Sequence, residues 1–243
     1  MRRSVYTTEY FLSSCNHSEE YLASGGHALG ILHAQALAWC NAPAGGFVID
    51  VGCGRGEVLA HLAHMGYHGV GVDFSDDAIR LSAATLRNVA SEAQCALLQA
   101  DVFRLPFTSG IADAVFCLDV IEHLPPNVAR LMLAECHRVL RFGGQLILHT
   151  CPTREFIVVG QWFKAMLCLL RWQSFHALTF ASQAGEDHVN LMCRRRLKRL
   201  MPPFSQTDIH YRFSTTAGTT KRLAGLLGLT RFLSHNLWAI CIR

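Results

Sequence analysis

The 243-residue sequence is short of charge: 16% of its residues are Asp, Glu, Lys or Arg, whereas 51% are hydrophobic. It also lacks an uninterrupted apolar run long enough to span a bilayer, and its beginning, Met1-Arg2-Arg3-Ser4, lacks the pattern of a signal peptide. These absences predict a cytoplasmic protein. The length and the apolar content suffice for a substantial core in one α/β domain.

No two cysteines form a C-x-x-C pair, although the chain has ten. The absence of such pairs argues against a zinc or redox motif, so we expect reduced cysteines that behave as small core residues. Acidic charge is also scarce, but the net charge of +4 is mild and depends on one basic run, residues 194–199. That run is interpreted either as a solvated helix face or as a surface for RNA or an anionic membrane.

One stretch organises the rest of the chain. The apolar run Val48–Val51, interrupted by Asp50, is followed by Gly52, Gly54 and Gly56, which predicts a buried strand, a tight turn and the start of a helix. The glycines allow backbone conformations that other residues avoid, and they let a ligand lie against bare main chain. The G-x-G-x-x-G fingerprint of dinucleotide-binding folds fits less well, because the third glycine comes one residue early.

Asp50 and the three glycines resemble the D/E-x-G-x-G-x-G signature of class I S-adenosylmethionine-dependent methyltransferases. The resemblance implies S-adenosyl-L-methionine as cofactor. That cofactor has no phosphate, so a carboxylate near its positively charged amino acid end is electrostatically reasonable. From about residue 47 to 151 the order and spacing of motifs remain similar to this family, including a D-x-x-E-H stretch at residues 119–123.

Strands and helices alternate after the glycine stretch. We expect strands at 47–51, 69–73, 95–100, 112–118 and 145–150, and helices at 56–66, 76–90 and 126–140, the last ended by a left-handed glycine cap within 141–144. Segments 207–213 and 237–242 would add the sixth and seventh strands, with a helix near 219–233. This pattern predicts a doubly wound, mostly parallel seven-stranded sheet of the Rossmann-like methyltransferase type.

Four segments of a single domain are predicted. They are an N-terminal helical lid at 1–43, the cofactor-binding core at 44–151, a helical substrate-cap insertion at 152–206 and the C-terminal strands at 207–243. In the lid, Tyr6, Tyr10 and Phe11 are candidate substrate contacts, with core packing as the alternative. In the cap, Trp162, Phe163, Met166 and Trp172 are predicted to form a hydrophobic pocket wall, and segment 156–172 could instead lie at a membrane interface.

Acids follow two further strands. Asp73 could accept hydrogen bonds from a ribose diol, and Asp101 could accept one from an adenine amino group, with the next backbone N–H serving a ring nitrogen. The predicted cofactor contacts are Asp50, Gly52, Cys53, Gly54, Gly56, Asp73, Phe74, Asp101, Val102 and the backbone around Leu118.

Asp119, Glu122 and His123 stand at i, i+3 and i+4, which places them on one face if the stretch is helical. His123 is a candidate general base oriented by a neighbouring acid, and His149 is a second candidate base or a hydrogen-bonded core residue. Alternatively, Asp119, Glu122, His123 and His188 hold a divalent cation. This ligand set resembles that of ubiquinone-pathway O-methyltransferases and small-RNA 2′-O-methyltransferases, although Asp119 stands where those families usually have glutamate. Magnesium, manganese and zinc all suit such ligands.

The interpretation favoured by these residues is methyl transfer to a small or lipid-like acceptor, at oxygen. An RNA ribose 2′-O-methyltransferase, supported by the basic run and a metal site, is the first alternative. A non-catalytic S-adenosylmethionine-binding scaffold is the second, and a nicotinamide-dependent dehydrogenase fits least.

Overall fold

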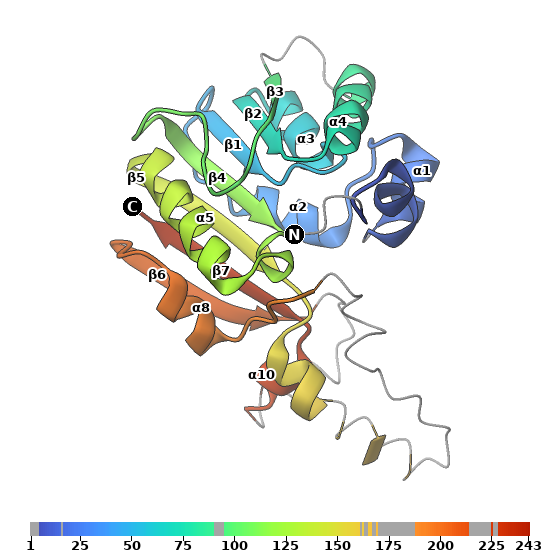
Figure 1. The fold of residues 1–243 in the computed structure, drawn as a ribbon, viewed down its shortest axis with the longest axis vertical. Coiled ribbons are helices and arrows are strands. Elements are labelled where there is room, and N and C mark those ends of the chain that lie inside the picture. The colour runs from blue at the N-terminus through green and yellow to red at the C-terminus, as the bar shows by residue number, and fades with distance from the viewer. Residues whose placement is uncertain are drawn as a thin grey trace.

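The computed structural model describes residues 5–15, 17–89, 95–160, 188–213 and 228–243, together with the single positions 162, 165, 166, 169 and 225. A twisted sheet crosses the molecule, and helices cover both of its faces (Figure 1). The strands are β1 (Phe47–Val51), β2 (His68–Asp73), β3 (Cys95–Gln99), β4 (Ala112–Leu118), β5 (Leu140–Thr150), β6 (Gln206–Arg212) and β7 (Asn236–Ile242).

The seven strands are arranged in the order β3-β2-β1-β4-β5-β7-β6. Strands β1 to β5 pair in parallel, and β7 inserts antiparallel between β5 and β6. Strands β1 and β4 are apolar over most of their length because both faces of a parallel sheet are covered. The predicted seven-stranded, mostly parallel fold is confirmed.

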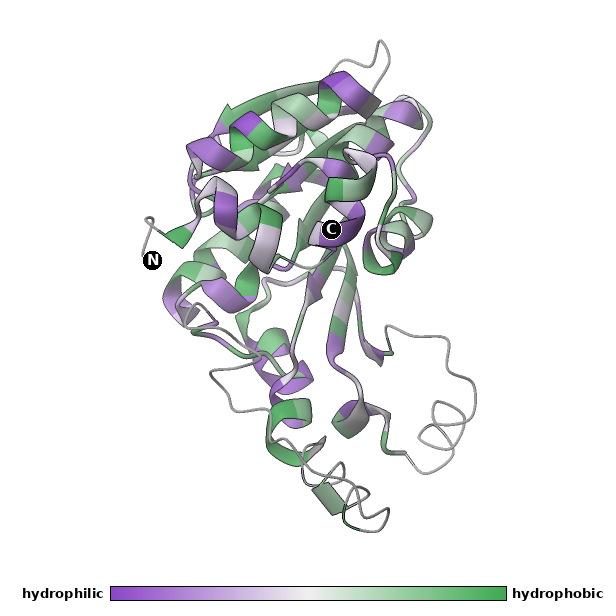
Figure 2. Ribbon diagram, turned by 90° about the vertical axis from the view of Figure 1, so that its right-hand side faces the viewer, coloured by the Kyte–Doolittle hydropathy of each residue, from purple (hydrophilic) through white to green (hydrophobic). Residues whose placement is uncertain are grey.

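Two hydrophobic layers hold the helices to the sheet. On one face, α5 (Pro126–Val139) and α8 (Arg194–Leu200) pack through residues such as Met132, Leu133 and Leu197. On the other face, α2 (Ile31–Ala38) and α3 (Glu57–His64) pack around Phe116 and Trp238. The helices carry hydrophilic and hydrophobic residues in alternation, as Figure 2 shows. Each buries one side, which is what helical periodicity dictates.

The remaining helical elements are short, apart from α4. The structure has η2 (Tyr10–Ser14), α1 (Ser18–Ser24), α4 (Asp76–Val89), η3 (Ile121–His123), η4 (Phe156–Gly160) and α10 (Thr230–Leu233). Of the helix expected near 219–233, α10 and position 225 are helical, and residues 219–224, 226 and 227 lie outside the described residues. Residues 228 and 229 are described and are not helical, so α10 is separated from any helix before it. None of the helices in the described ranges combines the length and apolarity that crossing a membrane requires.

The start of β5 differs from the prediction. Helix α5 ends at Val139, and Leu140 is already extended and pairs with Ala112, so β5 begins before residue 145. The register then shifts between Ala112 and Ala114, which leaves residues 141–143 exposed. Gly143 has the expected positive φ of 76°, but it serves this irregularity within the strand, not a helix cap.

Candidate active site

A cavity of about 270 Å³ lies at the carboxyl ends of β1, β2 and β4. The strand order reverses between β1 and β4, and ligands of open α/β sheets bind at such a point. The cavity is lined by Tyr6, Tyr10, Phe11, Ser14, Cys15, His33, Gly52, Cys53, Gly54, Arg55, Glu57, Asp73, Phe74, Val102, Leu118, Asp119, Val120, Glu122, His123, Leu124, Cys151, Pro152 and His188. Segments from the N-terminus to residue 188 therefore converge on one site.

The glycine turn forms one wall of the cavity. Gly52 has φ 76°, and a Cβ there would lie 2.3 Å from Cγ2 of Val120, so only glycine fits between β1 and the segment after β4. Gly56 has φ 80° and approaches Ser82 of α4 in the same way. Gly54 also has a positive φ and donates its N–H to Oδ2 of Asp73 at 3.1 Å. The turn presents main chain to the cavity.

Asp73 ends β2 and faces the same cavity. Its carboxylate accepts hydrogen bonds from the N–H groups of Gly54 and Ser75, the latter at 2.9 Å. Burial raises the pKa of Asp73, and these N–H groups counteract that rise. A buried carboxylate at the edge of a cavity is suited to accept hydrogen bonds from the hydroxyls of a ligand.

The structure brings most of the predicted cofactor residues together. Gly52, Cys53, Gly54, Asp73, Phe74, Val102 and Leu118 line the cavity. Asp50, Gly56 and Asp101 do not. Asp50 is 3% exposed within β1, and burial together with the charges of Asp73 and Glu57 raises its pKa to about 7. Asp50 is therefore buried within the sheet, outside the cavity.

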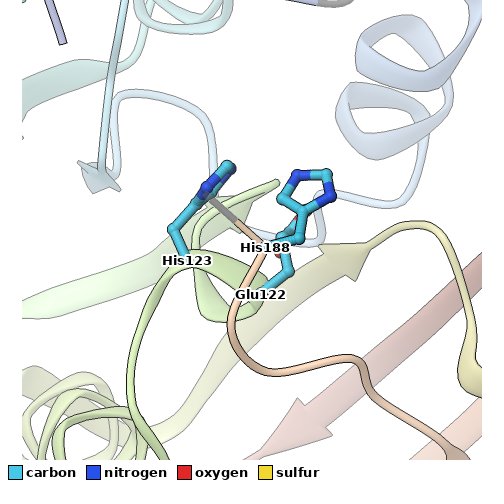
Figure 3. A group of neighbouring side chains, drawn as sticks. All are labelled: Glu122, His123 and His188. Atoms are coloured by element: carbon cyan, nitrogen blue, oxygen red, sulfur yellow. The ribbon is translucent and has the colours of Figure 1, made fainter. Parts of the chain in front are cut away.

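Glu122, His123 and His188 meet at the other end of the cavity, where atoms able to bind a metal lie within 4.8 Å of one another. Figure 3 shows the three side chains converging from two segments that are far apart in the sequence. Asn190 fixes this meeting, because its N–H donates to the Glu122 carbonyl at 3.0 Å and its side-chain amide donates to the Ile121 carbonyl at 3.3 Å. The His123 and His188 ring centroids are 4.5 Å apart.

Glu122 is 1% exposed and accepts a hydrogen bond from the Thr150 hydroxyl at 2.9 Å. Burial, with a smaller contribution from the negative charge of Asp119, raises its pKa. One carboxylate and two imidazoles form a donor set that suits a divalent cation. The chemistry of these three residues fits such an ion.

The four predicted metal ligands do not form one group. Asp119 is grouped with Glu122 and Cys151, not with the two histidines. The stretch is not a continuous helical turn, since Asp119 has φ 54° and the 3-10 helix η3 begins only at Ile121. The Asp119 carboxylate contacts Nδ1 of His149 at 2.6 Å. His149 is 1% exposed and is not among the residues that line the cavity, so its ring does not face the cavity as a base there would.

The N-terminal segment closes the cavity with aromatic side chains. The Tyr6 ring contacts Phe74 at 5.1 Å and His123 at 5.9 Å between centroids, and Tyr10 and Phe11 line the same wall. The segment is attached to the turns below it, because the Ser75 hydroxyl donates to the Tyr6 carbonyl and Arg55 donates to the Phe11 carbonyl. These rings reach both ends of the site.

The lining residues that were missed from the sequence include Cys15, His33 and Arg55. Burial lowers the pKa of His33 to about 4, and its Nδ1 is buried without a hydrogen-bond partner within the described residues. Burial raises the pKa of Cys15 to about 11, which disfavours a thiolate. Arg55 stands inside the glycine motif, a signal that could have been used, whereas nothing near Cys15 or His33 marks them.

The predicted hydrophobic pocket wall is not formed by the cap residues that the structure describes. Trp162 is 77% exposed and Met166 is 51% exposed, and neither lines the cavity. Phe163 and Trp172 lie outside the described residues. The apolar lining comes instead from the N-terminal segment, from Phe74 and Val102, and from residues 118, 120 and 124 around the end of β4.

Comparison with known proteins identifies the central part of the chain. Residues 49–148 match the family described as "Methyltransferase domain", and the match runs from β1 to most of β5. This part of the chain is a methyltransferase domain of the class I S-adenosylmethionine-dependent type. The match contains the glycine turn, Asp73 and the Glu122–His123 pair, and it excludes the N-terminal segment and His188.

A ubiquinone biosynthesis O-methyltransferase from Xanthomonas axonopodis pv. citri is 30% identical over 125 residues, which are 51% of this chain and 51% of that protein. The chain thus spans about half the length of the curated relatives it matches. The identity is confined to a part of the molecule.

Two solved methyltransferases share the fold more completely. Phosphoethanolamine N-methyltransferase 2 from Haemonchus contortus, solved with S-adenosyl-L-methionine, has a TM-score of 0.66 at 12% identity, covering 98% of this chain and 60% of that one. Geranyl diphosphate C-methyltransferase from Streptomyces coelicolor A3(2), solved with Mg²⁺, geranyl diphosphate and S-adenosyl-L-homocysteine, has a TM-score of 0.63 at 14% identity, covering 95% and 85%. At this identity they show the fold alone.

Proposed function

We propose that this chain transfers the methyl group of S-adenosyl-L-methionine to an oxygen atom of a small or lipid-like acceptor. The observation that carries the proposal is that the glycine turn with Asp73 and the Glu122–His123–His188 group open into the same cavity. A methyl donor and its acceptor have to lie near contact distance in a site that excludes water. One cavity with two chemically different ends meets that requirement.

The cofactor end fits S-adenosylmethionine. The bare main chain at Gly54 lets a ligand approach, and the Asp73 carboxylate is a hydrogen-bond acceptor for a ribose diol. When bound, the sulfonium of this cofactor supplies an electrophilic methyl group, so no covalent nucleophile is needed from the chain. The chain's own residues have to orient the two reactants and remove a proton from the acceptor.

The acceptor end favours oxygen. A hydroxyl needs a base or a cation to become a good nucleophile, whereas an amine needs only to lose its proton. His123 lies in the cavity beside the carboxyl of Glu122 and the ring of His188, and can accept the hydroxyl proton. The same three residues would hold a divalent ion, which lowers the pKa of a bound hydroxyl. The O-methyltransferase names of the curated relatives support this choice.

An RNA acceptor is the second candidate, because α8 carries exposed basic residues at Arg194, Arg195, Lys198 and Arg199. RNA binding through this helix would weaken steeply with added salt. Oligonucleotide binding that is absent or independent of salt would remove the RNA candidate.

The lipid-like acceptor is supported by a set of exposed apolar residues after β5. They are Val158, Trp162, Met166 and Leu169, whose side chains are 51–78% exposed.

Two variants test the division of labour. Asp73→Ala should weaken cofactor binding by about 1–3 kcal/mol through lost charged hydrogen bonds and should do so without any acceptor present. His123→Ala should lower turnover far more than cofactor affinity, because it removes the group at the acceptor end. Calorimetry with S-adenosylhomocysteine and transfer of a labelled methyl group to phenolic and aliphatic alcohols provide the two measurements.

Each variant is the control for the other. Equal losses of affinity and turnover in His123→Ala would assign that residue a structural role. Unchanged affinity in Asp73→Ala would contradict the cofactor assignment. Full turnover after dialysis against a chelator would contradict a role for a metal ion and leave His123 as the base. A stable cofactor complex that methylates no acceptor tested would favour a binding scaffold.

A further inference from the structure

Asp119 occupies an unusual position at the end of β4. It has φ 54°, in the left-handed region that residues other than glycine seldom adopt, although Asp and Asn are the more frequent exceptions. This backbone turn directs its side chain toward His149 on the neighbouring strand β5, with 2.6 Å between Oδ1 and Nδ1. The Asp119 side chain remains 23% exposed and lines the cavity.

The contacts of His149 fix the orientation of its ring. Nδ1 faces a carboxylate oxygen of Asp119, and Nε2 lies 3.1 Å from Oδ1 of Asn236. The Asn236 amide is oriented by its other end, because Nδ2 donates to the Arg212 carbonyl at 3.2 Å. The ring of Trp238 lies against the His149 ring, with 4.3 Å between the centroids. These contacts hold Nδ1 of His149 toward Asp119.

The contact with His149 keeps Asp119 ionised. Burial alone would raise the pKa of Asp119, but the adjacent charge and hydrogen bond of His149 hold it below its ordinary value. A carboxylate so stabilised is a poor proton acceptor, which argues against a role as general base. Oδ1 of Asp119 contacts Nδ1 of His149 and accepts a hydrogen bond from the Cys151 thiol. Within the described part of the chain, no group forms a hydrogen bond with Oδ2 of Asp119.

The position of Asp119 in the cavity indicates which part of the cofactor its Oδ2 would contact. Val120, the next residue, lies beside Gly52, and Asp119 lines the same cavity as the turn. Asp73, the expected ribose ligand, ends β2, which lies on the other side of β1 from β4. The amino acid part of S-adenosylmethionine carries an ammonium group, and an ionised carboxylate in a largely enclosed cavity is a strong acceptor for it.

We infer that Asp119, positioned by His149 and Asn236, accepts a hydrogen bond from the α-ammonium group of the cofactor. This inference rests on the proposed function. It gives Asp119 a binding role, apart from the base and metal-ligand roles considered from the sequence, and it makes His149 a positioning residue.

Two ligands that differ only in the amino acid part test the inference. S-adenosylhomocysteine has the ammonium group, whereas 5′-methylthioadenosine has the same nucleoside and a thioether but no amino acid. Asp119→Asn should lower the affinity for S-adenosylhomocysteine by about ten- to a hundredfold, the range of one charged hydrogen bond. It should change the affinity for methylthioadenosine less than twofold. Asp73→Asn is the matched control, since it should weaken both ligands alike.

The affinity for methylthioadenosine also reports whether the variant cavity is folded. Equal losses for both ligands, or no loss for either, would overturn the role of Asp119. A loss for S-adenosylmethionine without a loss for S-adenosylhomocysteine would place the carboxylate at the sulfonium and overturn it too. Failure of the unmodified protein to bind S-adenosylhomocysteine would instead contradict the proposed function.

His149 has its own control. His149→Gln keeps a donor toward Asp119, whereas His149→Leu removes it, so the glutamine variant should retain more of the affinity for S-adenosylhomocysteine. Equal affinities in these two variants would show that His149 does not position Asp119.

Discussion

The protonation of Asp50 affects the stability of the fold. Its carboxyl is buried within β1, near Asp73 and Glu57, and its pKa is raised to about 7. The folded protein therefore holds this proton up to near pH 7, whereas the unfolded chain releases it near the ordinary aspartate pKa of 3.8. Because the folded state binds more protons between these values, the free energy of unfolding has to fall as pH rises through this range.

Asp50→Asn should remove this dependence. The variant resembles the protonated side chain, so relative to the unmodified protein it should gain stability between pH 4 and pH 7, by up to about 4 kcal/mol at 1.36 kcal/mol per pKa unit. Urea unfolding of the cofactor-free protein across this range measures the difference. A difference that does not change with pH would show that Asp50 is ionised throughout.

At the residue scale the sequence predicted what local motifs encode. The positions of Gly52, Gly54 and Asp73 around the cavity follow from a strand, a turn and the next strand, all within a short stretch of chain. The sequence marked Asp119 as a candidate site residue but did not predict its contact with His149, because that contact depends on the register between β4 and β5. His33 reaches the cavity through the packing of α2, which no local pattern specifies.

The N-terminal segment is the element whose placement depends most on a single side chain. Arg55 is 4% exposed and pairs with Glu57, which is 5% exposed, with 3.0 Å between Nε and Oε2. It also donates to the Phe11 carbonyl at 3.0 Å and lies over the Tyr21 ring at 4.9 Å. One guanidinium thus joins the glycine turn to η2 and α1.

Arg55→Met should lower the free energy of unfolding by about 3–5 kcal/mol, because it leaves the Glu57 carboxylate buried without a partner. Arg55→Met/Glu57→Leu should recover most of that stability but not the bond to Phe11. Hydrogen exchange of residues 5–15 should therefore be faster in both variants. Arg80→Met is the control, since the Arg80 side chain is 66% exposed and its ion pairs contribute less than about 1 kcal/mol. Unchanged exchange in the double variant would contradict this attachment.

Elements that depend on periodicity were predictable, and those that depend on distant contacts were not. The strands from β1 to β4 lie within a residue or so of their expected bounds. The first residues of β5 were missed because Leu140 is extended through pairing with Ala112, while the glycines that follow indicated a turn. The apolar cap was expected over the cavity from composition alone, and composition does not fix the direction of a segment.

At the scale of the whole molecule, the cavity joins parts that are far apart in the chain. The glycine turn, the end of β2, the end of β4, the loop at His188 and the N-terminal segment all contribute. The sheet order that unites them is predictable from the alternation of strands and helices. The acceptor is not, because Tyr6, Tyr10, Phe11 and His188, which line the cavity together with His123, lie outside the family match at 49–148.

The most direct test is a calorimetric titration of the purified protein with S-adenosylhomocysteine and, separately, with NAD⁺. The account predicts saturable one-to-one binding of S-adenosylhomocysteine that NAD⁺ does not displace. A protein that binds NAD⁺ at this site, or that gives no binding heat with S-adenosylhomocysteine and no shift of its melting temperature, would contradict it.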